Sequence, residues 1–158
     1  MLRRDQYRAV HARLDSLLET ERDWVSAMAT VVCELHHAFE AFHWTGFYRV
    51  TEPELLRIGP YQGGHGCLEI AFDRGVCGAA ARQGTLIRLD DVSSFQGHIA
   101  CAASTQSEIV VPVLDAHGRV FAVLDVDSDL PAAFNEIDEE ELSLLASRLG
   151  ARYGSAAS

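Results

Sequence analysis

The stretch SEIVVPVLDAHGRVFAVLDVDS, residues 107–128, decides the fold. Within it, Ile109–Leu114 and Val120–Asp127 are rich in aliphatic and β-branched residues, as strands are. The four residues DAHG between them have the length and composition of a turn, so the two strands are expected to form an antiparallel hairpin. Such a short connection excludes a doubly wound parallel sheet, in which strands are joined by long crossovers.

The second strand of this hairpin carries two different faces, because successive side chains of a strand point to opposite sides. One face is apolar throughout and consists of Val120, Ala122, Leu124 and Val126. The other face ends in Asp125 and Asp127, and Glu108 begins the neighbouring strand, opposite roughly residue 125. If the three acids meet, their repulsion raises the pKa of at least one of them. The alternative is that the strand simply leaves the core there and its acids are solvated.

Helices are expected on both sides of the strand region. Apolar residues recur at helical spacing in two helices within residues 2–40 and again in a C-terminal helix over 135–152. Thr20 is the expected N-cap of the second helix and Asn135 that of the last. Cys33 lies beside the apolar stripe of the second helix, so we expect it to be a small buried hydrophobic residue.

The segment between the helices, residues 44–128, reads as strands and loops. A further hairpin is expected near residues 46–58 and a short helix near 75–84. Residues 90–107 show neither helical nor strand periodicity, and a loop of that length in a compact domain is usually functional. The chain, residues 1–158, is therefore expected to be one α/β domain with a largely antiparallel central sheet flanked by helices.

Composition limits the classes of partner. Hydrophobic residues make up 48% of the chain and charged residues 23%, as in folded water-exposed domains. The net charge of −10, with scattered basic residues, argues against nucleic acid and anionic membrane surfaces as partners. The N-terminus lacks the apolar segment of a secretory signal, and no apolar run approaches the roughly 18 residues of a membrane span. We therefore expect a cytoplasmic protein, in which thiols are kept reduced.

Three cysteines, Cys67, Cys77 and Cys101, lie in the middle of the chain, and none of them forms a CxxC motif. Cys101 lies in the long loop shortly before Glu108, so its thiol could reach the acids. Cys77 begins the short helix, where the helix dipole favours a thiolate, and Cys67 follows a glycine-rich loop. This arrangement suits a nucleophilic thiol with a resolving partner, and it indicates thiol redox chemistry on a small polar molecule.

A zinc site is the alternative use of the same thiols. His98 and Cys101 have HxxC spacing, and His65, Cys67 and Cys77 could complete a ligand set. The cysteines are single residues rather than paired knuckles, so we expect no metal.

Trp44 and Tyr48 stand four residues apart in the first expected strand, so both point to one face of the sheet. They are either ordinary core residues or, if that face carries the acids, the wall of a pocket for an apolar or S-methyl group.

Residues 44–128 resemble the free methionine-(R)-sulfoxide reductases, single-domain enzymes with the GAF fold. The matching segments are WTGFY (44–48), GPYQG (59–63), Cys67, GVCG (75–78), GHIAC (97–101), SEIVVP (107–112) and VLDVDS (123–128). Other GAF domains lack this combination of three cysteines and three acids, so the resemblance is specific to the reductases.

The resemblance implies a role for each of these residues. Cys101 is implied as the nucleophile, Cys67 as its main resolving partner and Cys77 as an auxiliary resolving thiol. The resemblance further implies that Glu108, Asp125 and Asp127 hold the polar end of the substrate, whereas Trp44 and Tyr48 contact its methyl side. Thioredoxin is the implied reductant, no cofactor or metal is implied, and a homodimer is compatible with the fold.

Two other classes of function compete with this one. A GAF domain can be a ligand-binding sensor module, which normally acts through an output domain. The same thiols could instead form a redox switch, which becomes oxidised without converting methionine sulfoxide.

Overall fold

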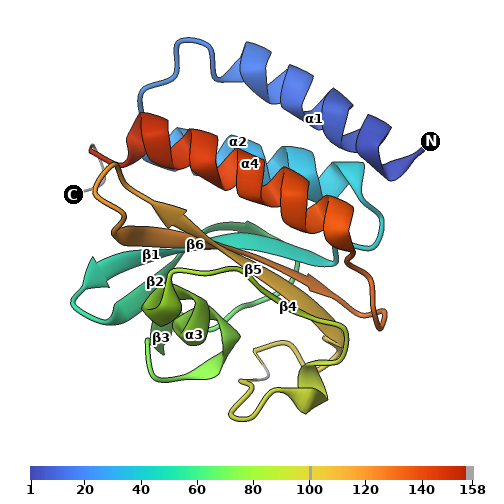
Figure 1. The fold of residues 1–158 in the computed structure, drawn as a ribbon. Coiled ribbons are helices and arrows are strands. Elements are labelled where there is room, and N and C mark those ends of the chain that lie inside the picture. The colour runs from blue at the N-terminus through green and yellow to red at the C-terminus, as the bar shows by residue number, and fades with distance from the viewer. Residues whose placement is uncertain (100, 156–158) are drawn as a thin grey trace.

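The computed structural model describes residues 1–99 and 101–155 and shows a six-stranded sheet (Figure 1). All neighbouring strands in it are antiparallel, in the order β3-β2-β1-β6-β5-β4. The strands are β1 (Trp44–Glu52), β2 (Leu55–Gln62), β3 (Glu69–Ala71), β4 (Ile87–Leu89), β5 (Ser107–Leu114) and β6 (Val120–Ser128). The hairpin read from residues 107–128 is β5–β6, and it lies in the interior of the sheet next to β1.

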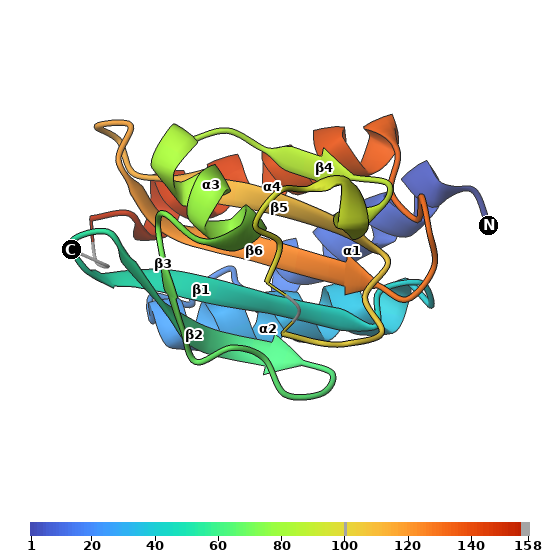
Figure 2. The same cartoon turned by 90° about the horizontal axis from the view of Figure 1, so that it is seen from below.

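Helices cover both faces of this sheet. The helices are α1 (Arg3–Leu17), α2 (Trp24–Ala38), α3 (Gly75–Gln83) and α4 (Glu136–Tyr153), with a 3-10 turn η1 (Val92–Ser94). Helices α2 and α4 lie side by side on one face, and α1 packs outside them (Figure 1). The short helix α3 and the loop that follows β4 lie over the opposite face, as the view from below shows (Figure 2). The predicted α/β class and the antiparallel sheet flanked by helices are confirmed.

The main core lies between the sheet and the helices α2 and α4. Ala122, Leu124 and Val126 of β6 point into it, as the alternation of side chains predicts. The expectation for Val120 is wrong, because Val120 packs against the second cluster on the α3 side while Phe121 packs against the main core. The pairing of β5 with β6 shifts register by one residue at this point, which exchanges the faces at the start of the strand.

Two local expectations at helix α2 are wrong. The N-cap is Asp23 rather than Thr20, since the Asp23 carboxylate accepts a hydrogen bond from the backbone N–H of Ser26 at 2.8 Å. Cys33 is exposed rather than buried, and its Sγ lies 3.8 Å from Nδ1 of His37. It sits at the solvent edge of the apolar stripe.

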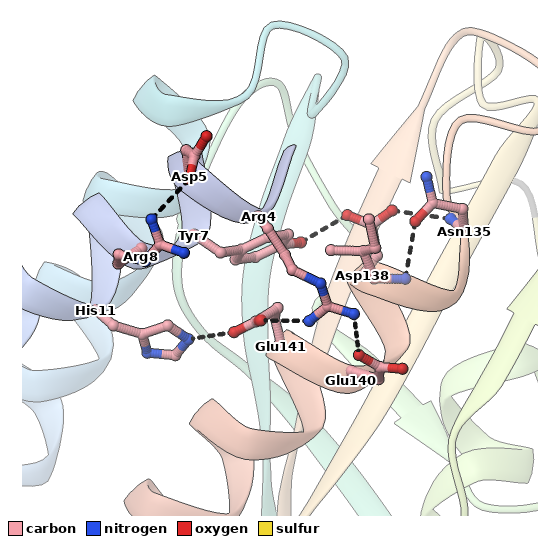
Figure 3. Close-up of polar contacts among 10 residues, drawn as sticks. Arg4, Asp5, Tyr7, Arg8, His11, Asn135, Asp138, Glu140 and Glu141 are labelled. Atoms are coloured by element: carbon pink, nitrogen blue, oxygen red, sulfur yellow. Dashed lines mark hydrogen bonds and ion pairs between the residues drawn. The ribbon is translucent and has the colours of Figure 1, made fainter. Parts of the chain in front are cut away.

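Helix α4 begins at a capping box and is linked to α1 through a buried acid. Asn135 caps the helix as predicted, and Asp138 accepts a hydrogen bond from the backbone N–H of Asn135 at 2.8 Å. The other Asp138 oxygen accepts a hydrogen bond from Tyr7 Oη at 2.7 Å (Figure 3) and one from Arg3 Nε at 2.8 Å. On the same interface, Arg4 pairs with Glu140 and Glu141.

None of the helices in residues 1–99 and 101–155 combines the length and the apolar composition that crossing a bilayer requires.

Candidate active site

The sheet face beneath α3 brings the three predicted acids together. Glu108 on β5 pairs with Asp127 on β6, and Trp44 on β1 pairs with Asp127 from the other side. We expected Glu108 opposite roughly residue 125, and the register differs by one same-face step. Glu108, Asp125 and Asp127 are only 6%, 4% and 8% exposed, so the solvated alternative is wrong.

Burial controls the charge of these acids. The pKa values of Glu108 and Asp127 are raised well above their usual range, first by burial and then by repulsion from Asp125. The pKa of Asp125 rises to about 6, because burial raises it while the neighbouring Glu108 and Cys77 donate to it and limit the shift. Asp125 is therefore the acid of the cluster that ionises most readily as pH rises, whereas the raised pKa values of Glu108 and Asp127 favour their protonated forms.

The cluster is also incompletely hydrogen-bonded. One oxygen of each acid, Glu108 Oε1, Asp125 Oδ1 and Asp127 Oδ1, is buried without a hydrogen-bond partner among the described residues. Buried polar atoms without partners are costly, and they are uncommon unless a ligand or water satisfies them. These oxygens are therefore placed to bind something that carries hydrogen-bond donors or positive charge.

The sulfur atoms of Cys67 and Cys101 form a disulfide beside the acids. The two residues are 34 positions apart in the sequence, and their Cα atoms are 5.3 Å apart. Cys67 follows the glycine-rich turn after β2, and Cys101 lies in the loop that precedes β5. The bond thus joins two loops across the sheet face that carries the acids.

Cys77 is a free thiol on α3 and differs from the expectation that its helix would favour a thiolate. The residue is 4% exposed, and burial, followed by the negative charges of Asp125 and Glu108, raises its pKa well above the ordinary value. The dipole of a nine-residue helix does not offset burial next to three acids. The predicted thiolate at Cys77 is therefore wrong.

Aromatic residues form one wall of the site. The Trp44 and Tyr48 rings are stacked with centroids 5.9 Å apart, so the prediction that they share a face is confirmed. Trp44 Nε1 donates a hydrogen bond to the backbone oxygen of Gly64 at 3.0 Å, which fixes the indole against the glycine-rich turn. A Cβ on Gly66 would lie 2.9 Å from the indole and 3.1 Å from the Tyr48 hydroxyl, so this turn can approach the rings only with glycine there.

These groups enclose a cavity of about 30 Å³. Its lining includes seven of the predicted residues, namely Trp44, Tyr48, Cys77, Cys101, Glu108, Asp125 and Asp127, and the eighth, Cys67, is bonded to Cys101. A space of this size holds about one water molecule.

The cavity also contains residues to which the sequence assigned other roles or none. His65 and His98 line it, and His98 Nε2 lies 3.9 Å from Glu108 Oε1. Burial lowers the pKa of His98, so its ring is neutral at pH 7. Ile70 and Val76 complete an apolar wall that sequence reasoning missed, because apolar residues in a strand or helix carry no signal that separates a pocket wall from a core.

Comparison with known proteins defines the class first. The model of the GAF domain family matches residues 19–151. The six-stranded antiparallel sheet, with α2 and α4 on one face and α3 and the candidate site on the other, is thus that of a single GAF domain.

Individual relatives within the GAF domain family indicate a narrower family. The chain is 34% identical over 143 residues to the free methionine-R-sulfoxide reductase of Escherichia coli K12, covering 90% of this chain and 86% of that protein. It is 40% identical over 144 residues to protein YtsP of Bacillus subtilis 168, covering 90% and 88% of the two chains. The X-ray structure of the Neisseria meningitidis free methionine-R-sulfoxide reductase in complex with its substrate is 41% identical, with a TM-score of 0.88 and coverage of 95% and 89%. The chain belongs to the free methionine-R-sulfoxide reductase family of GAF domains.

Proposed function

We propose that this protein reduces free L-methionine-(R)-sulfoxide to L-methionine and oxidises Cys101 and Cys67 to a disulfide. The observation that carries the proposal is the cavity in which buried acids with unpaired oxygens lie beside a pair of cysteines close enough to bond. The family relationship supports the same reaction.

The acids and the aromatic wall account for the choice of substrate. Asp125 is ionised at neutral pH, so with Asp127 beside it, it can bind the ammonium group of a free amino acid. A methionine inside a peptide lacks that ammonium, and it would leave the buried carboxylate unpaired. Trp44 and Tyr48 offer an apolar surface to the S-methyl group.

The chemistry requires a proton donor and two thiols. Burial raises the pKa of Glu108 and favours its protonated form, which can donate a proton to the sulfoxide oxygen. The Cys101 thiolate attacks the sulfur, the oxygen is transferred to give a sulfenic acid, and methionine leaves. The Cys67 thiol then condenses with the sulfenic acid, which forms the disulfide and releases water. Cys77 serves as an auxiliary resolving thiol, slowed by its raised pKa.

The disulfide must be reduced before another turnover. We assign this step to thioredoxin, a dithiol reductant of the cytoplasm, where the protein is expected to act. Cys67→Ser should permit a single turnover but slow steady-state recycling by thioredoxin, and an unchanged steady-state rate would contradict the resolving role of Cys67.

The first test measures methionine released from free L-methionine-(R)-sulfoxide with dithiothreitol as reductant. Wild type and Cys33→Ser should release methionine at equal rates, because Cys33 is exposed and lies outside the cavity. Cys101→Ser should release none. Normal turnover by Cys101→Ser would contradict the assignment of Cys101 as the nucleophile.

A redox switch is the second candidate, since the same disulfide would serve it. It predicts that peroxide forms the Cys67–Cys101 disulfide while no methionine is released from the sulfoxide by wild type. That result would replace the reductase proposal.

A further inference from the structure

One group of atoms in the cavity resembles part of a metal site rather than a recognition site for an amino acid alone. Cys77 Sγ and one carboxylate oxygen each of Glu108 and Asp125 lie within 4.8 Å of one another. In a tetrahedral zinc site the ligand atoms are roughly 3.3–3.8 Å apart, as bonds of about 2.0–2.3 Å require. A closure of about 1.5 Å or less therefore brings the three atoms to ligand spacing.

The surroundings add an independent observation. Glu108 and Asp125 are more than nine-tenths buried, and each has an oxygen in the cluster region with no hydrogen-bond partner among the described residues. Asp127, also buried, places a third carboxyl group beside them. A small cation satisfies such oxygens without the space that a larger donor group needs.

The size of the cavity is compatible with a four-coordinate metal ion that has three protein ligands. A space of about 30 Å³ accommodates one water molecule or an ion of similar size. Zinc sites with three protein ligands hold a water or another small ligand in the fourth position. His98, whose Nε2 lies 3.9 Å from Glu108 Oε1, is an alternative fourth ligand.

We propose that the cavity is a binding site for a thiophilic divalent cation, with Zn²⁺ held by Cys77, Glu108 and Asp125. The thiol selects Zn²⁺ over Mg²⁺ and Ca²⁺, which prefer oxygen ligands. The site is present when Cys67 and Cys101 are joined, because none of its three ligands takes part in that disulfide. If the proposed reaction is correct, Zn²⁺ competes with the substrate ammonium for Asp125 and inhibits the enzyme.

Cobalt is the probe, because Co²⁺ bound to a thiolate absorbs in the near ultraviolet through sulfur-to-metal charge transfer. In the disulfide form the free thiols are Cys33 and Cys77, so the Cys33→Ser variant leaves Cys77 as the reporting sulfur. Oxidised Cys33→Ser protein should develop this band, saturate at one Co²⁺ per chain and lose the band when Zn²⁺ is added. Absence of the band would overturn the proposal.

Further variants test the ligands. Cys33→Ser/Cys77→Ser should bind Zn²⁺ about tenfold more weakly or worse by calorimetry, with circular dichroism verifying the fold, and so should Cys33→Ser/Glu108→Gln. Unchanged affinity in either variant would overturn the assignment. The binding measurements need no turnover. If the protein binds Co²⁺ through Cys77 but releases no methionine, the metal site is supported and the proposed reaction is contradicted. If it releases methionine but does not bind Co²⁺, only the metal site is contradicted.

Discussion

Two groups of buried carboxylates lie on opposite faces of the same sheet, and they differ in how their oxygens are satisfied. Asp138, on the α1–α4 side, is fully buried and accepts hydrogen bonds from Tyr7 and the backbone N–H of Asn135 (Figure 3) and from Arg3. Glu108, Asp125 and Asp127, on the α3 side, are almost as buried, yet each has an oxygen without a partner among the described residues.

This difference in hydrogen bonding distinguishes an acid that stabilises the fold, Asp138, from acids that are placed to bind a ligand. A buried carboxylate with a complete set of donors contributes to stability, and its removal leaves the donors unpaired. A buried acid with an unpaired oxygen costs stability, and we expect it to persist because a ligand outside the chain uses that oxygen. The same substitution should therefore have opposite consequences on the two faces.

The largest effect is expected on catalysis at Glu108. Glu108→Gln keeps the shape of the side chain but removes the acidic proton, so kcat/KM for methionine sulfoxide should fall about 100- to 1,000-fold. Steady-state kinetics with dithiothreitol measures the loss. Activity close to wild type would mean that the α3-side acids do not take part in the reaction.

The next effect is expected on stability at Asp138. Asp138→Asn places an amide where Arg3, Tyr7 and the backbone N–H of Asn135 all donate, so the free energy of unfolding should fall by about 3 kcal/mol. Urea unfolding measures this change, and the activity of the remaining folded protein should match wild type. An unchanged midpoint would show that the bonds of Asp138 contribute no more than surface contacts.

Asp125→Asn should change stability in the opposite direction. Its pKa is raised from 3.8 to about 6 in the folded state, so the folded state gains stability from protonation below about pH 4 and loses it as pH rises through 6. The asparagine variant lacks this loss and should be more stable than wild type at pH 8 by about 3 kcal/mol. Urea unfolding at pH 4 and pH 8 tests the sign, and a variant less stable than wild type at pH 8 would contradict it.

Glu69 provides the smallest effect and the reference for the others. It is an exposed residue of β3 that pairs with Arg57 at 2.7 Å. Glu69→Gln should change the free energy of unfolding by about 0.5 kcal/mol or less and leave turnover unchanged. Asp127→Asn measured alongside it should lose much more activity. Equal activities of the Glu69→Gln and Asp127→Asn variants would mean that the acid cluster takes no part in the reaction.

Much of this organisation follows from periodicity. The alternation along β6 was sufficient to place Asp125 and Asp127 on one face, and the short turn was sufficient to pair them with the strand of Glu108. The exact partner of Glu108 could not be read, because the connection is one residue longer than DAHG and the unpaired Phe121 shifts the register by one more residue. The α3-side apolar wall was also invisible, since Ile70 and Val76 look like core residues in any sequence.

The surroundings of a residue were harder to predict from the sequence than the secondary-structure element to which it belongs. Cys77 was placed correctly at the start of a short helix, but its pKa depends on acids from two strands that the helix covers only after folding. The burial of Cys33 and the N-cap residue of α2 were predicted wrongly for two local reasons. A residue at the edge of an apolar stripe turns outward with a small rotation of the helix, and two acceptable capping residues stood within one turn of each other.

The bond between Cys67 and Cys101 has a kinetic consequence. With the two loops joined, Cys101 Sγ is bonded to Cys67 and is no longer a free thiol. In the proposed reaction, the oxidised protein therefore cannot attack a second sulfoxide until a reductant has opened the bond. The two substrates must then bind in alternation, and double-reciprocal plots at several reductant concentrations should be parallel, as in ping-pong kinetics.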